Sequence, residues 1–247
     1  MQKTNEFIFE VCANGLTSLL SAQKAGATRA ELCQAIEIGG LTPSYACLKL
    51  AAAQKTIPVH VLIRCRAGHY VYSNLEKLQM LEDIKLVKSL GFEGVVVGAL
   101  LEDGGIDMDY LKEVKKLSSG LHLTFHRAID AACDPLSSLG ILVELGFDTV
   151  LTSGAEPTAL QGVELLQEMQ QGYGNQIRIM AGGGINAQNA RTIAEETGVK
   201  ALHFSAKTKM QLQEIYPQGI DVTEADMTFS ATDAELVKAI IRGVQAD

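Results

Sequence analysis

Eight short apolar or alternating runs recur along the 247 residues, separated by segments of helical spacing, and this alternation constrains the fold most. The runs are 7–12, 27–33, 58–64, 94–99, 121–127, 148–154, 177–184 and 201–206. Segments between them, such as 75–84 and 159–166, contain good helix formers. Eight uninterrupted βα units predict an α/β protein folded as one closed (β/α)8 TIM barrel, a single domain spanning residues 1–247. A doubly wound open sheet is the alternative.

Composition and charge exclude several classes of protein. Hydrophobic residues make up 47% of the chain, which is ample for a large core and argues against general disorder. The chain has 21 Lys and Arg against 29 Asp and Glu, a net charge of −8, so its overall field repels phosphate backbones and anionic lipid surfaces. We therefore expect neither a nucleic-acid partner nor a membrane partner.

The location of the protein is predicted from what the sequence lacks. The longest apolar run, 95–101, is far shorter than the roughly 18 residues of a transmembrane helix. The first residues carry no apolar signal core or small-residue cleavage site. Five cysteines, an odd number without a regular spacing, do not form a disulfide framework. These features predict a cytoplasmic protein with free thiols.

The alternation within each strand predicts which side chains point toward the barrel axis. One set of alternate residues is apolar and should meet the helices, as with Phe9 and Val11 or Leu123 and Phe125. The other set is strongly polar and contains Glu10, Cys12, Glu31, Cys33, His60, Arg64, His122, Thr124, His126, Arg178, His203 and Ser205. Each unpaired buried charge costs several kcal/mol. This interior therefore requires a dense hydrogen-bond network or a bound polar ligand.

One stretch after the last strand does not follow the repeat. Residues 207–230 show neither helical nor strand periodicity and precede an amphipathic helix predicted at 233–244. A segment this long in a compact domain is usually functional or interfacial, and its position places it at the rim of the barrel mouth. Its many apolar residues predict that it packs across the mouth or against another subunit.

Two thiols and several charged residues are expected to meet at the mouth, where barrels place their functional groups. Cys12 and Cys33 end neighbouring strands, so we expect their sulfur atoms within about 8 Å of each other, close enough to share a soft ion such as Cu(I). The alternative is that both are small buried core residues, since no CxxC spacing supports a metal site.

Charged residues at the ends of other strands suggest a different chemistry. Arg64 and Arg127 can hold a carboxylate or phosphate, and His126 can act as a general acid or base with Glu10 or Glu31 as partner. The structural alternative is that Arg64 pairs with Glu10 or Glu31 as internal filling.

A glycine run predicts a second part of an anion site. Gly182, Gly183 and Gly184 end the seventh strand, and Ser205 and Ala206 follow the eighth. Backbone N–H groups at these positions commonly bind phosphate in barrels. We expect this group to face Arg64 and His126 across the mouth.

Several strings in this order resemble the CutC family of copper homeostasis proteins. They are EVC at 10–12, ELC at 31–33, GGLTPS at 39–44, TFHRAID at 124–130, LTSG at 151–154, IMAGGGI at 179–185 and HFSA at 203–206. The resemblance implies a cytoplasmic TIM barrel that forms a homo-oligomer, is associated with copper tolerance, and in some members binds Cu(I) through cysteine. The family's metal-candidate thiols match Cys12 and Cys33.

The chain departs from the family pattern in one loop. Where the family has Arg-Pro-Arg followed by glycines and an Asp, residues 64–69 read RCRAGH, which adds the thiol of Cys65 and the imidazole of His69. Two hypotheses therefore follow from the sequence. The first is a copper-binding homeostasis protein using Cys12 and Cys33, with copper as its bound ion. The second is an enzyme acting on a small phosphorylated or carboxylated metabolite.

Overall fold

A computed structural model of the protein describes residues 7–211 and 228–245, and its centre is a closed parallel barrel. The strands follow one another around the barrel in chain order: β1 Ile8–Asn14, β2 Arg29–Cys33, β3 Val59–Leu62, β4 Gly94–Val97, β5 His122–Phe125, β6 Thr149–Thr152, β7 Arg178–Gly182 and β8 Ala201–Phe204. β1 also pairs with β8, which closes the ring. The predicted (β/α)8 barrel is confirmed, and the open-sheet alternative is wrong because such a sheet keeps two free edges.

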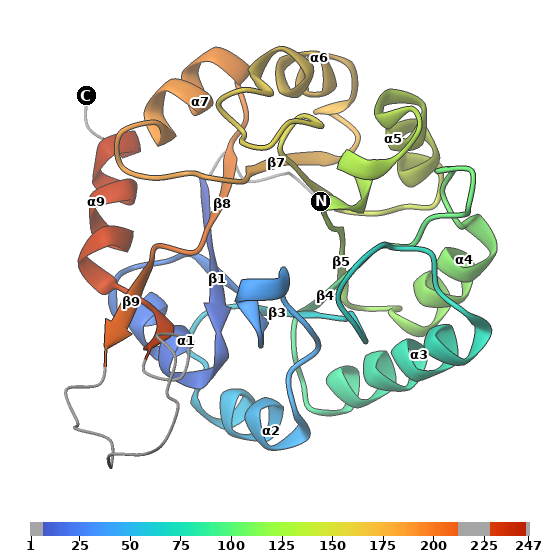
Figure 1. Ribbon diagram of the computed structural model, residues 1–247, viewed down its shortest axis with the longest axis horizontal. Coiled ribbons are helices and arrows are strands. Elements are labelled where there is room, and N and C mark those ends of the chain that lie inside the picture. The colour runs from blue at the N-terminus through green and yellow to red at the C-terminus, as the bar shows by residue number, and fades with distance from the viewer. Residues whose placement is uncertain (1–6, 212–227, 246–247) are drawn as a thin grey trace, which may run out of the picture.

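Helices form a ring around the strands (Figure 1). They are α1 Gly15–Lys24, α2 Tyr45–Gln54, α3 Asn74–Ser89, α4 Met108–Leu117, α5 Pro135–Glu144, α6 Val163–Tyr173, α7 Ala190–Thr197 and α9 Ala234–Gln245, with short 3-10 turns η1 Ile36–Ile38 and η2 Arg127–Ala131. The helix predicted at 233–244 is α9, shifted by one residue. It lies beside α7 and α1, so the C-terminal helix completes the outer layer.

Local chemistry fixes where the elements begin. Ser73 and Glu76 form a reciprocal capping box at the start of α3, and Asp134 caps α5 with a proline following it. The valines of β4 are β-branched and fully buried, which favours a strand covered on both faces. Short caps and buried strands of this kind hold each strand end, and hence the mouth, in a fixed position.

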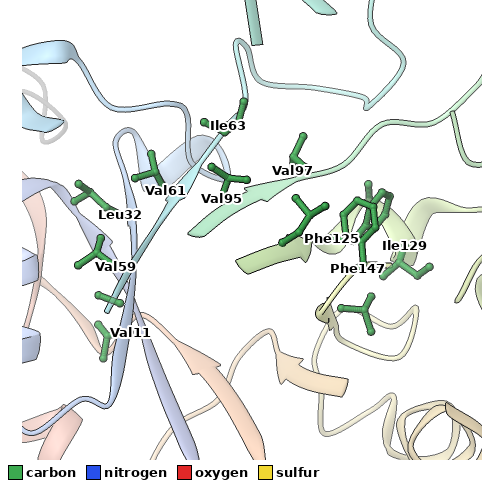
Figure 2. Close-up of a cluster of buried hydrophobic side chains, with 14 of the residues drawn as sticks. Val11, Leu32, Val59, Val61, Ile63, Val95, Val97, Phe125, Ile129 and Phe147 are labelled. Carbon is green, nitrogen blue, oxygen red and sulfur yellow. The ribbon is translucent and has the colours of Figure 1, made fainter. Parts of the chain in front are cut away.

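The main hydrophobic core lies between the strands and the helices. Figure 2 shows Val11, Leu32, Val59, Val61, Val95, Val97 and Phe125, which project outward from successive strands, and all are buried. The predicted apolar face of each strand is therefore confirmed. Two small apolar groups inside the barrel, Cys33 with Leu62 and Val96, and Leu151 with Met180 and Ala201, separate from this main core. Polar groups fill the remaining interior.

The segment after β8 differs from the irregular stretch expected at 207–230. Its first residues form β9 Lys207–Gln211, which pairs antiparallel with β10 Thr228–Thr232. The Thr232 N–H donates to Ser18 Oγ at 3.1 Å, which ties this hairpin to α1. The sequences of these strands, KTKMQ and TFSAT, are mostly polar or small and lack the apolar residues that mark the barrel strands, which explains the difference. Residues 212–227 lie outside the described part of the chain, so the predicted packing of this segment stays a prediction.

Among residues 7–211 and 228–245, the helices are all too short or too polar to traverse a lipid bilayer.

Candidate functional site

Neighbouring strands bring the two predicted thiols together at the barrel mouth. In the β1–β2 register Cys12 lies opposite Glu31, and Asn14 lies opposite Cys33, so both cysteines come from the same end of the sheet. Cys12 Sγ is 3.7 Å from Cys33 Sγ and 3.6 Å from Glu31 Oε1. The predicted separation of less than about 8 Å is confirmed. One donor atom from each of these three residues lies within 4.8 Å of the others, so they could hold one metal ion.

A buried ion pair lies beside the thiols. Glu10 is fully buried, and Arg29 Nε donates to its Oε2 at 2.5 Å. His203 Nδ1 lies 2.8 Å from the other carboxylate oxygen of Glu10. Glu10 and Glu31 therefore belong to one interior network, and the guanidinium that pairs with Glu10 is that of Arg29 rather than Arg64. Arg29 is not among the site residues predicted from the sequence, although Arg29 shares the inward alternation of Glu31 and Cys33.

The charges of this network favour a positively charged His203 beside the thiols. Burial alone would raise the pKa of Glu10, but Arg29 and His203 outweigh it and hold that pKa well below its usual range. Burial also opposes a charged His203, yet Glu31, with hydrogen bonds to Cys12 and Glu10, raises its pKa well above the ordinary value. His203 is therefore an imidazolium at neutral pH.

The thiol and the remaining carboxyl group hold their protons more strongly than usual. The hydrogen bond with Cys33, together with burial, raises the pKa of Cys12 well above its ordinary value. Burial raises the pKa of Glu31 against the opposing charge of His203, and Glu31 Oε2 has no hydrogen-bond partner among the described residues. A metal ion that binds the thiolates of Cys12 and Cys33 must therefore displace the protons of these thiols.

Cys12 lines a cavity of about 400 Å³ at the mouth, together with Glu31, Arg64, Tyr70, His126, Arg127 and His203, whereas Cys33 is fully buried and does not line it. A larger hollow of about 840 Å³ lies between α1 and the β9–β10 hairpin, but it contains none of the predicted site residues. We therefore take the smaller cavity as the candidate site. It brings predicted groups from five strand ends into one space.

Arg64 is anchored by the backbone rather than by an acidic side chain. Its Nη1 donates to the carbonyl oxygens of Ile38 and Gly40, and its Nη2 to that of Gly68. The expected structural alternative, an ion pair with Glu10 or Glu31, is not found among the described residues, where Arg29 takes the contact with Glu10. Arg64 thus keeps its charge facing the cavity.

His126 is a neutral histidine buried beside Arg64. Burial and the Arg64 charge lower the pKa of His126 to about 3. The Ala128 N–H donates to His126 Nδ1 at 3.1 Å, so the ring proton lies on Nε2. A base this weak is poorly matched to proton transfer at neutral pH. The geometry favours His126 as a hydrogen-bond donor.

Gly98, which directly follows β4, leaves room for the His126 ring. A Cβ added to Gly98 would lie 2.5 Å from both Cε1 and Nδ1 of His126. Gly98→Ala is therefore expected to displace the imidazole and lower the free energy of unfolding by about 1–3 kcal/mol. Urea denaturation measures this change. Gly172→Ala in α6 is the control, because nothing lies within 4 Å of its Cβ and alanine favours a helix; equal effects of the two variants would contradict the prediction.

Arg127 reaches the same cavity but is paired. Its Nε donates to Asp130 Oδ2 at 2.7 Å and its Nη2 to Ser153 Oγ at 2.7 Å. Thr152 Oγ1 and the Ser153 N–H also donate to Asp130, which links η2 to the end of β6. The sequence analysis quoted Asp130 within a motif and gave it no role. Its role is to balance and position Arg127.

The predicted glycine half of the anion site is divided between two places. Gly184, Ser205 and Ala206 line a separate cavity of about 240 Å³ beside α9. Gly183 lies near Arg127, with an added Cβ 3.4 Å from Nη1, and Gly182 packs against Leu151. These residues do not share a cavity with Arg64 and His126, so the expected arrangement across one mouth is not what the structure brings together.

Cys65 and His69, the two departures from the family pattern, do not line the cavity at the mouth. Cys65 is half-buried, and burial raises the pKa of its thiol. His69 is exposed, and its Nδ1 accepts a hydrogen bond from the Val71 N–H at 3.3 Å. Arg66 holds this loop by donating to the carbonyl oxygens of His69 and Val71.

Comparisons with known proteins agree with this arrangement. The family model of the CutC family matches residues 7–208. A CutC protein from Pasteurella multocida is 40% identical over 239 residues, covering 96% of this chain and 98% of that one. Another from Bacteroides fragilis is 43% identical over 206 residues, covering 83% and 82%. The crystal structure of a Streptococcus agalactiae CutC, provisionally assigned to copper homeostasis, is 36% identical with a TM-score of 0.76 and covers 81% of this chain and 98% of that one. This chain belongs to the CutC family.

Proposed function

We propose that this protein takes part in copper homeostasis by binding Cu(I) through the thiolates of Cys12 and Cys33. The observation that carries the proposal is the 3.7 Å separation of the two sulfur atoms, of which that of Cys12 belongs to a residue lining the mouth cavity. Soft thiolate ligands select Cu(I) over harder ions, and a pair of them suits a low-coordinate ion. The reducing cytoplasm predicted from the sequence would keep both thiols available.

The surrounding charges support the same proposal. Two thiolates with one Cu(I) carry a net negative charge, and the raised pKa of His203, to which Glu31, Cys12 and Glu10 contribute, favours a positive charge beside them. Arg29, which pairs with Glu10, adds a second positive charge to the same network. Glu31 Oε1 near Cys12 offers an acceptor for the displaced proton or an additional oxygen ligand. Copper is the cargo in this proposal, so no catalysed reaction is required.

A competition titration with a chromophoric Cu(I) chelator under anaerobic, reducing conditions tests the proposal. Cys12→Ser and Cys33→Ser should each weaken Cu(I) binding by about 100-fold, because even changes around a metal's ligands cost 10–100-fold. Cys133→Ser is the matched control, since that thiol is exposed and does not line the cavity, and it should bind as the unaltered protein does.

Zn(II) titrated in the same way should bind more weakly than Cu(I). The proposal fails if Cys12→Ser and Cys33→Ser both retain the affinity of the Cys133→Ser control. The same series with Cys65→Ser shows whether the extra thiol of the loop takes part.

A further inference from the structure

The lining of the mouth cavity also contains residues with unpaired hydrogen-bond donors. Arg64 follows β3, His126 follows β5, and Tyr70 lies in the loop between β3 and α3. All three line the cavity of about 400 Å³. The Tyr70 ring is 5.3 Å from Arg64 Cζ and 4.9 Å from the His126 ring, so it contacts both.

Arg64 holds an uncompensated charge in this wall. Only 5% of the residue is exposed, and its three hydrogen bonds go to neutral carbonyl oxygens. Its Nε has no hydrogen-bond partner, and no carboxylate lies within ion-pair distance of it in the described part of the chain. A buried guanidinium of this kind is costly unless an anion accompanies it.

His126 supplies a second unsatisfied donor. It is 5% exposed, and its Nδ1 already accepts from the Ala128 backbone. The proton on Nε2 therefore has to be donated elsewhere, yet this atom has no partner among the described residues. Buried donors without acceptors are rare in folded proteins, and each one requires an explanation.

We propose that Arg64 and His126 bind the carboxylate of a small organic acid in the barrel mouth. The two free donors, Arg64 Nε–H and His126 Nε2–H, could each donate to one oxygen of a carboxylate. One uncompensated positive charge suits a monoanion better than a phosphate dianion, because Asp130 already balances Arg127. The Tyr70 ring offers an apolar contact for the carbon atoms of the ligand.

A carboxyl group in the same lining restricts the class of ligand further. Glu31 lines the same space, is 4% exposed, and has Oε2 without a hydrogen-bond donor among the described residues. A hydroxyl or amino group on the acid would donate to this oxygen. The ligand class is therefore a small hydroxy or amino acid, and its binding does not depend on copper.

Isothermal titration calorimetry of the copper-free protein with glycolate, acetate and inorganic phosphate tests the proposal. Glycolate should bind in the millimolar range, more tightly than acetate because of Glu31, and more tightly than phosphate. His126→Phe should weaken glycolate binding by about tenfold or more, the usual contribution of a hydrogen bond to a charged group. His69→Phe is the matched control on the rim and should bind glycolate as the unaltered protein does.

Nitrogen-15 NMR of the histidine rings gives a readout that does not depend on the variants folding. Glycolate should shift the Nε2 resonance of the ring whose Nδ1 is unprotonated and buried, while the His69 ring stays unchanged. Absence of glycolate binding at tens of millimolar, or equal loss in His126→Phe and His69→Phe, overturns the carboxylate site. Equal affinity for acetate and glycolate overturns the role of Glu31. Cys12→Ser should still bind glycolate, so the failure of this proposal and of the copper proposal are distinguishable.

Discussion

Replacing Arg29 by methionine is expected to lower the free energy of unfolding by about 3–5 kcal/mol, the usual cost of breaking one side of a buried ion pair. Glu10 is fully buried, and Arg29 is the guanidinium that faces it at 2.5 Å. Without Arg29, the carboxylate keeps only the contact with His203. Urea denaturation at neutral pH, followed by far-UV circular dichroism, measures the loss.

Two further variants separate this effect from a general change of charge. Lys238→Met removes one member of an exposed pair with Glu235, so it should change stability by less than about 1 kcal/mol. The double variant Glu10→Gln with Arg29→Met removes both buried charges and should recover most of the lost stability. If Arg29→Met unfolds at the same urea concentration as Lys238→Met, the ion pair does not stabilise the barrel.

The second large effect is a loss of stability in mild acid, caused by neutral interior histidines. Burial is the largest cause that lowers the pKa of His126 to about 3 and that of His122 to about 4. An unfolded histidine takes up a proton below about pH 6.5, whereas these folded rings do not. The folded state is therefore fully favoured above pH 6.5 and loses stability as the pH falls. Between pH 6.5 and 4.5 each ring should account for up to about 2.7 kcal/mol, at 1.36 kcal/mol per pH unit.

Urea denaturation at pH 7.5 and pH 4.5 measures this dependence. His126→Gln removes one of the titrating rings, so its stability should fall less between the two pH values than that of the unaltered protein. His69→Gln serves as the control because His69 is exposed, and it should leave the pH dependence unchanged. An identical acid dependence in the His126 and His69 variants would show that His126 does not stay neutral in the folded state.

Much of the fold could be predicted because period-2 alternation is a strong pattern when one face of a strand is apolar and the other carries polar side chains. The strand runs, their outward apolar faces and the meeting of Cys12 with Cys33 follow from it. The partners of single charged groups do not, because they depend on register and closure. Arg29 meets Glu10 only because those two positions are opposite in the β1–β2 register. A one-residue slip would have paired Glu10 differently.

Other features of the site could not be predicted from the pattern of side chains along the sequence. The acceptors that hold Arg64 are backbone carbonyl oxygens of two loops, and any residue type can supply a carbonyl oxygen. The separation of Gly184 from His126 depends on where the β7 loop turns, which periodicity does not specify. The anion site was therefore predicted with the correct kinds of group, but the structure divides those groups between two cavities.

The pairing of β1 with β8 has a consequence for the order in which the protein folds. Glu10 and His203 are 193 positions apart in sequence, although their side chains are hydrogen-bonded. A chain emerging from the ribosome has made β1 long before β8 exists, so Glu10 and the free edge of β1 stay exposed until synthesis is nearly finished. Early strands can pair in sequence order, but both edges remain open. The last strand thus completes the sheet and the charge network in one event.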